Sequence, residues 1–290
     1  MVSKAMGALR NGLLSIGSVL VFWIFAQSFA LSQNPPQIRS QSGLPKASPP
    51  KAIDKKLPLD GETFLVDTSV AFVIPATKEF RAPTKPWVWY APTLPNLPGP
   101  EERWMFERFL DEGIAIAGID AGESYGSPDG NRVFDGLHRE MVRRGYSSTP
   151  VLLGRSRGGL QTLSWAAANP ERVAAWAGIY PVCNVASYPG LDRAAPAFSL
   201  TPEQLKEQLK QFNPVDRIEG LAKSKVPLFA IHGDIDTVVP LELNSGLLRE
   251  RYREHGGSMV LIIPPGQGHN MWDGFFQCRE LVDFAIQHAK

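Results

Sequence analysis

Hydrophobic positions follow two alternating patterns from residue 62 onward. Short, continuously apolar runs are typical of buried strands, and segments with apolar residues every three or four positions indicate amphipathic helices. The predicted strands are 63–66, 70–75, 87–91, 114–119, 150–153, 173–179, 226–231 and 258–263. The predicted helices are 101–112, 131–144, 158–168, 242–254 and 273–288. The first two strands lie close enough in sequence to form a hairpin.

This alternation predicts the α/β class, with a mostly parallel, doubly wound sheet of about eight strands flanked by helices. Strands that are apolar on both faces must be covered by helices on both faces. Right-handed crossovers then place the strand-to-helix loops at one edge of the sheet. An active site in such a fold lies at that edge, beyond the carboxyl ends of the strands.

Residues 184–225 separate two predicted core strands by more than an ordinary connection. Thr201 and Pro202, with Gln204 three residues after the threonine, form a capping signal that predicts a helix start. We therefore expect a small cap insertion over the active-site edge.

The N-terminal part of the chain predicts export. Residues 1–32 contain two basic residues, an apolar, uncharged run at 13–26 and small residues after it, which is the pattern of a cleaved signal peptide. The alternative is a retained anchor that contacts the membrane, because aromatic residues prolong the apolar run. Residues 33–60 are rich in proline and predict a linker. The catalytic domain is expected at 61–290, in a secreted or periplasmic protein.

Composition excludes several kinds of partner. Thirty Lys and Arg residues balance 29 Asp and Glu residues to a net charge of +1, which predicts no nucleic-acid binding. The sequence has no C-x-x-C or H-E-x-x-H pattern and no phosphate-binding glycine loop, so we expect neither metal nor cofactor. The two cysteines, Cys183 and Cys278, both fall near the active-site edge. An exported protein can bridge them, and the alternative is two separate buried thiols.

The strongest chemical signal is the segment 154–158, Gly-Arg-Ser-Arg-Gly, which directly follows a predicted strand and precedes a helix. Glycines on both sides of Ser156 allow a sharp, strained turn in which strand and helix pass closely. The turn exposes the serine hydroxyl at the helix N-terminus, where negative charge is favoured. The alternative is an ordinary strand-to-helix turn with a capping serine.

Two later segments complete the pattern. Residues 232–240 (His-Gly-Asp-Ile-Asp-Thr-Val-Val-Pro) and 266–270 (Gly-Gln-Gly-His-Asn) each follow a predicted strand. With the serine segment, they resemble the α/β-hydrolase superfamily in motif and in the chain order Ser, Asp, His. The resemblance covers residues 62–288 and includes the prolyl-oligopeptidase-like catalytic domains.

The resemblance implies a catalytic triad of Ser156 as nucleophile, His269 as base and Asp236 as the orienting acid. Asp236 holds the Asp position of the family's H-G-x-x-D pattern, whereas Asp234 is expected to bond local backbone and remains the alternative acid.

An oxyanion hole needs two N–H donors. The residue after the nucleophile supplies one, which is the backbone of Arg157. The second is expected after the strand ending at residue 91. Pro92 has no N–H, so Thr93 and Leu94 are the candidates.

Residues around the nucleophile suggest a substrate. The guanidinium groups of Arg155 and Arg157 either recognise a carboxylate or sulfate of the substrate or pair with Asp120 and Glu123. Tyr188 and Trp272 (with Phe198) are candidate walls of the substrate pocket, and the alternative for each is a packed core residue.

The elbow also resembles the G-x-S-R-x-G motif of glucuronoyl esterases through Gly154, Ser156, Arg157 and Gly159. It departs from that motif at Arg155, where those enzymes carry Cys, and at residue 160, where they carry Lys.

These features favour a hydrolase of carboxylic esters, acting on a small-molecule or carbohydrate ester, with acylated or uronate-containing carbohydrate as the expected class. One alternative is a serine peptidase of the prolyl-oligopeptidase type; the short stretch before the core argues against the propeller of those enzymes. Another is a non-catalytic binding module, which has no need of a complete triad.

Overall fold

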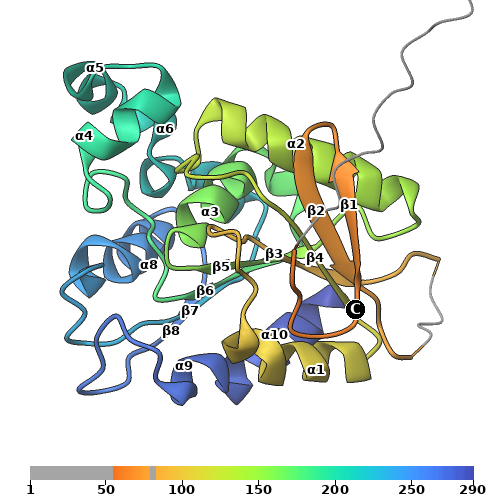
Figure 1. Cartoon of the computed structure of the whole chain (residues 1–290). Helices are drawn as coiled ribbons and strands as arrows, with labels where there is room; N and C mark the ends of the chain where they lie inside the picture. Colours follow the sequence, from red (N-terminus) through yellow and green to blue (C-terminus); the bar gives the residue numbers. More distant parts are fainter. Residues whose placement is uncertain (1–54, 79–82) are drawn as a thin grey trace, which may run out of the picture. The chain divides into compact units, whose positions relative to one another are not determined.

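The computed structural model describes residues 55–78 and 83–290, so the predicted signal peptide and most of the linker lie outside the described residues. One sheet organises the described chain, with strand order β1-β2-β4-β3-β5-β6-β7-β8 (Figure 1). Its strands are β1 (Glu62–Val66), β2 (Ser69–Ile74), β3 (Trp87–Tyr90), β4 (Ala115–Ile119), β5 (Val151–Arg155), β6 (Ala175–Ile179), β7 (Leu228–Ile231) and β8 (Met259–Ile262).

The sheet is mostly parallel, as predicted. β1 and β2 form an antiparallel hairpin, β2 pairs antiparallel with β4, and every other neighbouring pair is parallel. β3, β4, β6 and β7 are buried along their whole length. This burial on both faces explains why these strands are continuously apolar rather than alternating.

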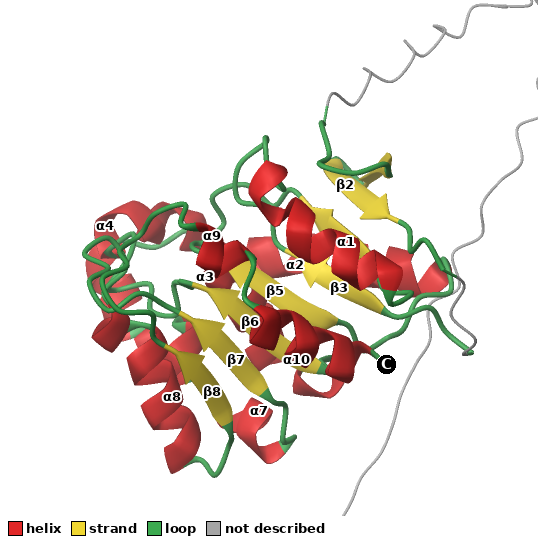
Figure 2. Ribbon diagram, turned by 90° about the horizontal axis from the view of Figure 1, so that it is seen from below, coloured by secondary structure: helices red, strands yellow, loops and turns green. Residues whose placement is uncertain are grey.

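Helices cover both faces of the sheet (Figures 1 and 2). Side chains of four helices join the hydrophobic cluster on one face: α2 (Pro128–Arg143), α3 (Gly158–Ala168), α7 (Glu219–Lys223) and α8 (Ser245–Glu254). Side chains of three others join the cluster on the opposite face: α1 (Arg103–Asp111), α9 (Asp273–Phe276) and α10 (Arg279–Ala289). Short 3-10 helices lie at η1 (Pro100–Glu102), η2 (Pro170–Arg172) and η5 (Leu241–Leu243). Within the described ranges, no helix is long and apolar enough to cross a bilayer.

The last predicted helix, 273–288, is interrupted. The backbone of Cys278 is extended, with φ −68° and ψ 104°, so α9 ends at Phe276 and α10 begins at Arg279. Cys278 therefore precedes a helix instead of lying within one. Helix α2 begins at Pro128, earlier than predicted, because the Ser127 side chain caps it by accepting from the N–H of Gly130.

The suggested disulfide is not formed. Cys183 and Cys278 are both free and buried. The reason is their position: Cys183 belongs to the hydrophobic cluster on one face of the sheet, and Cys278 to the cluster on the other face. The alternative expectation of two separate buried thiols holds.

Residues 184–225, the segment predicted as a cap, form a helical insertion at one corner of the sheet (Figure 1). Its elements are α4 (Leu191–Ala194), η3 (Ala195–Phe198), α5 (Pro202–Glu207), α6 (Leu209–Phe212) and η4 (Pro214–Asp216), followed by α7. The predicted capping box is present, since Thr201 Oγ1 accepts from the Gln204 N–H and the Gln204 side chain accepts from the Thr201 N–H. Apolar residues of this insertion form a third hydrophobic cluster together with Tyr125, Leu160, Val182 and Val239.

Candidate active site

Ser156 lies on the tight turn that connects β5 to α3. Its φ angle is +50°, a strained conformation for a residue with a side chain. The glycines around it permit the turn, because a Cβ on Gly154 would lie 2.6 Å from Thr162 Oγ1, and one on Gly158 would lie 2.9 Å from the Ala91 carbonyl oxygen. The Ser156 N–H donates to the Ile179 carbonyl at 3.0 Å, which joins the turn to β6.

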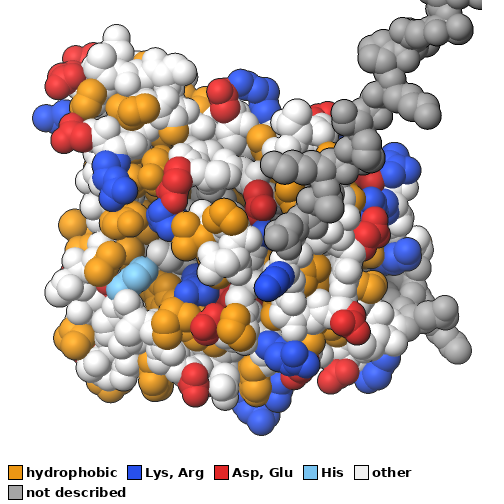
Figure 3. All heavy atoms as spheres, in the orientation of Figure 1, with side chains coloured by type: hydrophobic (Ala, Val, Ile, Leu, Met, Phe, Trp, Pro, Cys, Tyr) orange, Lys and Arg blue, Asp and Glu red, His pale blue; other side chains and the backbone are white. Residues whose placement is uncertain are grey.

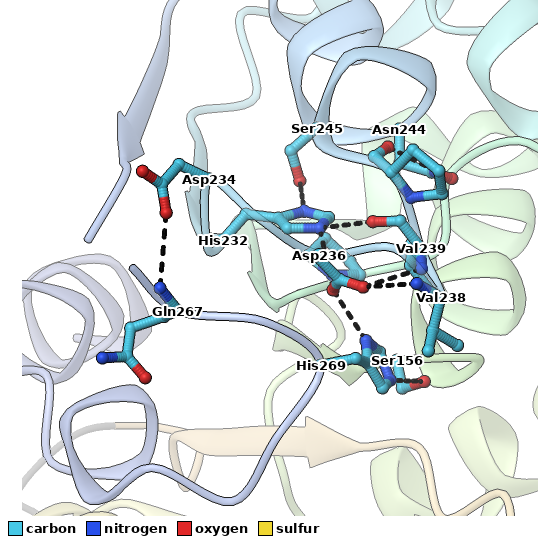
Figure 4. A network of polar contacts seen from close by, with 12 residues as sticks. Ser156, His232, Asp234, Asp236, Val238, Val239, Asn244, Ser245, Gln267 and His269 are labelled. Atoms are coloured by element: carbon cyan, nitrogen blue, oxygen red, sulfur yellow. Dashed lines mark hydrogen bonds and ion pairs between the residues drawn. The ribbon is translucent and has the colours of Figure 1, made fainter. Parts of the chain in front are cut away.

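His269 and Asp236 lie in the loops after β8 and β7, and the fold brings both to Ser156 (Figure 4). Ser156 Oγ and His269 Nε2 are 2.9 Å apart, and His269 Nδ1 lies 2.8 Å from Asp236 Oδ2. A carboxylate can only accept, so Nδ1 carries the hydrogen and Nε2 is the acceptor for the serine hydroxyl. The three side chains thus form one hydrogen-bonded chain from hydroxyl to carboxylate.

The Asp236 side chain is fully buried and held by several donors. Its Oδ1 accepts the backbone N–H groups of Val238 at 3.0 Å and Val239 at 2.8 Å. Burial alone raises the pKa of Asp236, but hydrogen bonds from His232, the Val239 N–H and His269 outweigh it and lower the pKa to about 2. Asp236 is therefore ionised at neutral pH.

Asp234, the alternative acid, points away from this chain (Figure 4). Its carboxylate accepts the backbone N–H of Gln267 at 3.3 Å, while the Ile235 N–H donates to the Gln267 carbonyl at 3.1 Å. Asp234 thus ties the loop after β7 to the loop after β8, which is the local backbone role expected of it.

The imidazole of His269 packs against Tyr180, whose ring centroid is 4.4 Å from its own. Burial lowers the pKa of His269 below 6.5, and the Asp236 carboxylate offsets only part of that effect. The ring is therefore neutral at pH 7 and able to accept a proton. Burial likewise raises the pKa of Tyr180 to about 12, so its hydroxyl stays protonated.

A cavity of about 330 Å³ opens beside Ser156 and His269. The three residues proposed for the oxyanion hole, Arg157, Thr93 and Leu94, all line it. The other lining residues are Asn96, Leu97, Glu101, Arg155, Tyr180, Asn270 and Met271.

Arg155 lines this cavity and is paired, but with a different partner from the one expected. Its Nη1 donates to Glu102 Oε1 at 2.7 Å, and Glu102 is fully buried. Asp120 instead accepts from Lys55 at 2.8 Å. The expectation was wrong because Glu102 comes from the start of α1, 53 residues earlier, where no local pattern signals the contact.

Arg157 forms an ion pair with Glu123, which is the partner that the ion-pair interpretation predicted for it. The Glu123 side chain is 42% exposed, so this ion pair faces solvent. The two arginines that flank Ser156 therefore differ: the ion pair of Arg155 is buried and the ion pair of Arg157 is not.

None of the three proposed wall residues lines the cavity, and Phe198 is buried in the third hydrophobic cluster. Tyr188 packs against the hydrophobic cluster of the cap, and Trp272 is 41% exposed with its ring against Phe275. Trp272 instead belongs to a rim of exposed hydrophobic residues on the loops after β3, β7 and β8. The other members of this apolar rim are Leu94, Ile235, Val238 and Met271. Figure 3 shows a histidine on the surface among hydrophobic side chains.

Sequence reasoning did not anticipate Tyr180 or Glu102. Tyr180 directly follows β6, so its position at the end of a parallel strand was a usable signal, whereas Glu102 had none. Within residues 55–78 and 83–290, no three His, Cys, Asp or Glu side chains are grouped as metal ligands.

Comparisons with known proteins agree with this fold. A sequence model of the prolyl oligopeptidase family matches residues 138–289, just over half of the chain. A comparison with curated protein sequences found no match.

Solved structures with the same fold include a puromycin-hydrolyzing peptidase of Mycobacterium tuberculosis, with TM-score 0.62 and 14% identity over 79% of this chain and 39% of the peptidase. This chain thus spans well under half of that protein. An S-formylglutathione hydrolase from Agrobacterium tumefaciens matches with TM-score 0.63 and 15% identity, over 80% and 94% of the two chains. A truncated carbohydrate esterase from gut microbiota matches with TM-score 0.58 and 17% identity, over 76% and 90%.

Proposed function

The chain belongs to the prolyl oligopeptidase family and is a serine hydrolase of the α/β-hydrolase type, and from this premise we propose that it cleaves carboxylic esters with Ser156 as nucleophile. His269 is the base and Asp236 the acid that orients it. The observation that supports the proposal is the hydrogen-bonded chain from Ser156 Oγ through His269 to Asp236 Oδ2, with distances of 2.9 and 2.8 Å.

Acylation begins when Ser156 Oγ attacks the ester carbonyl carbon and His269 Nε2 takes the hydroxyl proton. Asp236 keeps the imidazole in the tautomer with hydrogen on Nδ1 and stabilises the transient imidazolium. The tetrahedral intermediate then collapses, the bond to the alkoxy oxygen breaks, and His269 returns the proton to the departing alcohol. The acyl group remains on Ser156 as an ester.

The negative charge of the tetrahedral intermediate falls on the former carbonyl oxygen. The Arg157 N–H, at the start of α3, and the N–H of Thr93 or Leu94, after β3, are the donors proposed for it. A water molecule, activated by His269, then attacks the acyl-enzyme through a second such intermediate and releases the acid.

The position of Arg155 supports the proposal that the substrate carries an acidic group. Such a substrate would be an acylated or uronate-containing carbohydrate. Glu102 holds the guanidinium at the cavity wall by one nitrogen, while Nη2 donates to the sulfur of Met271 at 3.0 Å. Thioether sulfur is a weak acceptor, so a substrate carboxylate would be the better partner for this nitrogen. The fold likeness to a carbohydrate esterase is consistent with such a substrate.

Peptide hydrolysis is the second candidate, because the family takes its name from a peptidase and one of the matched structures is a peptidase. The same residues would act, with an amine in place of the alcohol as leaving group.

A substrate panel tests these proposals with the purified chain and two variants, Ser156→Ala and Ser224→Ala. Ser224 is exposed at the end of α7, away from the cavity, and serves as the control. The panel holds short p-nitrophenyl esters, an O-acetylated uronate ester whose carboxylate is free, the matching neutral sugar acetate and a prolyl-anilide peptide. Ester turnover that falls at least about 10⁴-fold in Ser156→Ala alone supports the ester proposal.

The other outcomes separate the alternatives. Cleavage of the anilide without ester turnover moves the conclusion to a peptidase. Ester turnover that survives in Ser156→Ala refutes the role of this serine. A uronate ester turned over no faster than the neutral sugar ester refutes the acidic substrate.

Export is proposed from the sequence of residues 1–32. N-terminal sequencing of the protein recovered from cell fractions tests it. A mature N-terminus near residue 33 outside the cytoplasm identifies a cleaved signal, and an intact N-terminus in the membrane fraction identifies an anchor. Intact protein in the cytoplasmic fraction refutes export.

A further inference from the structure

His232, directly after β7, is a buried histidine beside the proposed triad (Figure 4). Its Nε2 lies 2.8 Å from the Val239 carbonyl oxygen and 3.3 Å from Asp236 Oδ2. Its Nδ1 lies 2.8 Å from Ser245 Oγ. Each ring nitrogen therefore has a defined partner, and none of its side chain is exposed to solvent.

The acceptor beside Nε2 determines that this nitrogen carries the hydrogen of the ring. A carbonyl oxygen can only accept, so the Nε2 facing Val239 carries a hydrogen. The same nitrogen lies 3.3 Å from Asp236 Oδ2, the oxygen that also receives the His269 N–H. Both histidines thus place a ring nitrogen beside one carboxylate oxygen, while the other oxygen accepts two backbone N–H groups.

On the basis of the proposed triad, we propose that His232 is a positioning residue, which holds the Asp236 carboxylate in the orientation that receives His269. The two backbone donors bond only Oδ1. His232 lies beside Oδ2, the oxygen that receives the His269 N–H, and so limits how far the planar carboxylate can turn away from His269. Among the groups that lower the pKa of Asp236, the hydrogen bond from His232 has the largest effect.

The hydrogen bond from Ser245 to His232 continues into a buried polar network. Ser245 opens α8, and the residue before it, Asn244, is fully buried. Asn244 Oδ1 accepts the N–H groups of Cys183 at 3.0 Å and Asn184 at 3.2 Å, where the chain enters the cap. A hydrogen-bonded path therefore leads from the base of the cap to the carboxylate, which gives His232 a rigid neighbour on its far side.

The test compares His232→Phe, which keeps the ring but removes both nitrogens, with His232→Gln, whose amide can still donate to Val239 and Asp236. His138→Phe is the matched control, because His138 is also buried and bonded to a carbonyl, that of Ser148 at 2.8 Å, but lies on α2 away from the cavity. We expect His232→Phe to lower kcat for a p-nitrophenyl ester about 10- to 100-fold with KM changed less than about twofold. We expect His232→Gln to recover most of the loss and His138→Phe to leave kcat unchanged.

A pH profile separates positioning from general destabilisation. Asp236 raises the pKa of His269 by more than the charge of His232 lowers it, so a carboxylate that is no longer held against the imidazole dominates the change and raises that pKa less. The acid limb of kcat/KM is therefore expected to move to lower pH in His232→Phe. An unmoved limb with unchanged kcat, or a Gln variant no better than Phe, overturns the proposal.

Ser245→Ala is a second variant that tests the same proposal if His232→Phe does not fold. It removes only the hydroxyl behind Nδ1, and we expect a loss in kcat of about 3- to 10-fold at unchanged KM; a kcat equal to that of the unmodified chain counts against the proposal. Failure of the triad itself shows differently, because turnover then survives in Ser156→Ala.

Discussion

The buried ion pair between Arg155 and Glu102 allows a quantitative prediction. Glu102 has no exposed surface and receives three donors: Arg155 Nη1 at 2.7 Å, the Tyr90 hydroxyl at 2.8 Å and the Gly99 N–H at 2.8 Å. Arg155→Met keeps much of the aliphatic stem but leaves the carboxylate without its countercharge. Removing one partner of a buried pair costs roughly 3–5 kcal/mol.

We expect the lower end of that range, about 3 kcal/mol, because the hydroxyl of Tyr90 and the N–H of Gly99 still solvate the carboxylate. For a domain of this size, each kcal/mol moves Tm by about 2–4 °C, so the variant should melt about 6–12 °C lower. Urea and thermal unfolding followed by circular dichroism measure both quantities. Glu102→Gln with Arg155→Met removes both charges and should recover at least half of the lost stability.

The double-mutant cycle decides whether the pair behaves as argued. The reasoning is refuted if Arg155→Met lowers the free energy of unfolding by less than about 1 kcal/mol. It is also refuted if the double variant is no more stable than the sum of the two single losses in free energy predicts. The double variant also isolates the substrate role of the guanidinium, because it keeps the fold while removing the charge from the cavity wall. Preference for a uronate ester over a neutral sugar ester should then disappear.

Three further predictions follow from the site. Because burial lowers the pKa of His269, kcat/KM should fall on the acid side with a midpoint below pH 6.5, as the protonated ring cannot accept the serine proton; a pH–rate profile measures this. Gly154→Ala places a Cβ 2.6 Å from Thr162 Oγ1, so we expect at least about a 100-fold loss in kcat and a lower Tm, measured by ester turnover and thermal unfolding. Burial raises the pKa of the Cys183 and Cys278 thiols, so a thiol-reactive dye should label neither in the native chain and both in denaturant, and a chain that gains no label in denaturant would contradict two free thiols.

The elements that the sequence predicted well are those with a local physical signature. The strand-to-helix turn at residue 156 required glycines within a few positions, and the loops carrying Asp236 and His269 each follow an apolar strand. Parallel topology then brought side chains 113 positions apart into contact. Periodicity and turn chemistry were sufficient for this part of the site.

The features that the sequence did not predict depend on contacts between distant segments. Glu102 meets Arg155 only because the fold brings η1 near the end of β5, and no spacing rule links the two residues. The break at Cys278 was missed because the apolar pattern of α9 and α10 continues across it. The position of His232 at the carboxylate was not predicted, since only the folded loop places its Nε2 beside Asp236.

The strand before His269 differs from its neighbours. β8 ends the sheet and, among the parallel strands of the described chain, is the one with an exposed residue, Val260 at 49%. Edge segments with few buried contacts open locally at a lower free energy than the core. Detachment of β8 carries the imidazole away while β3 to β7 stay paired. Heating should therefore inactivate the enzyme reversibly at temperatures below its global melting transition. Ester turnover should detect the opening of this edge at a lower temperature than circular dichroism does.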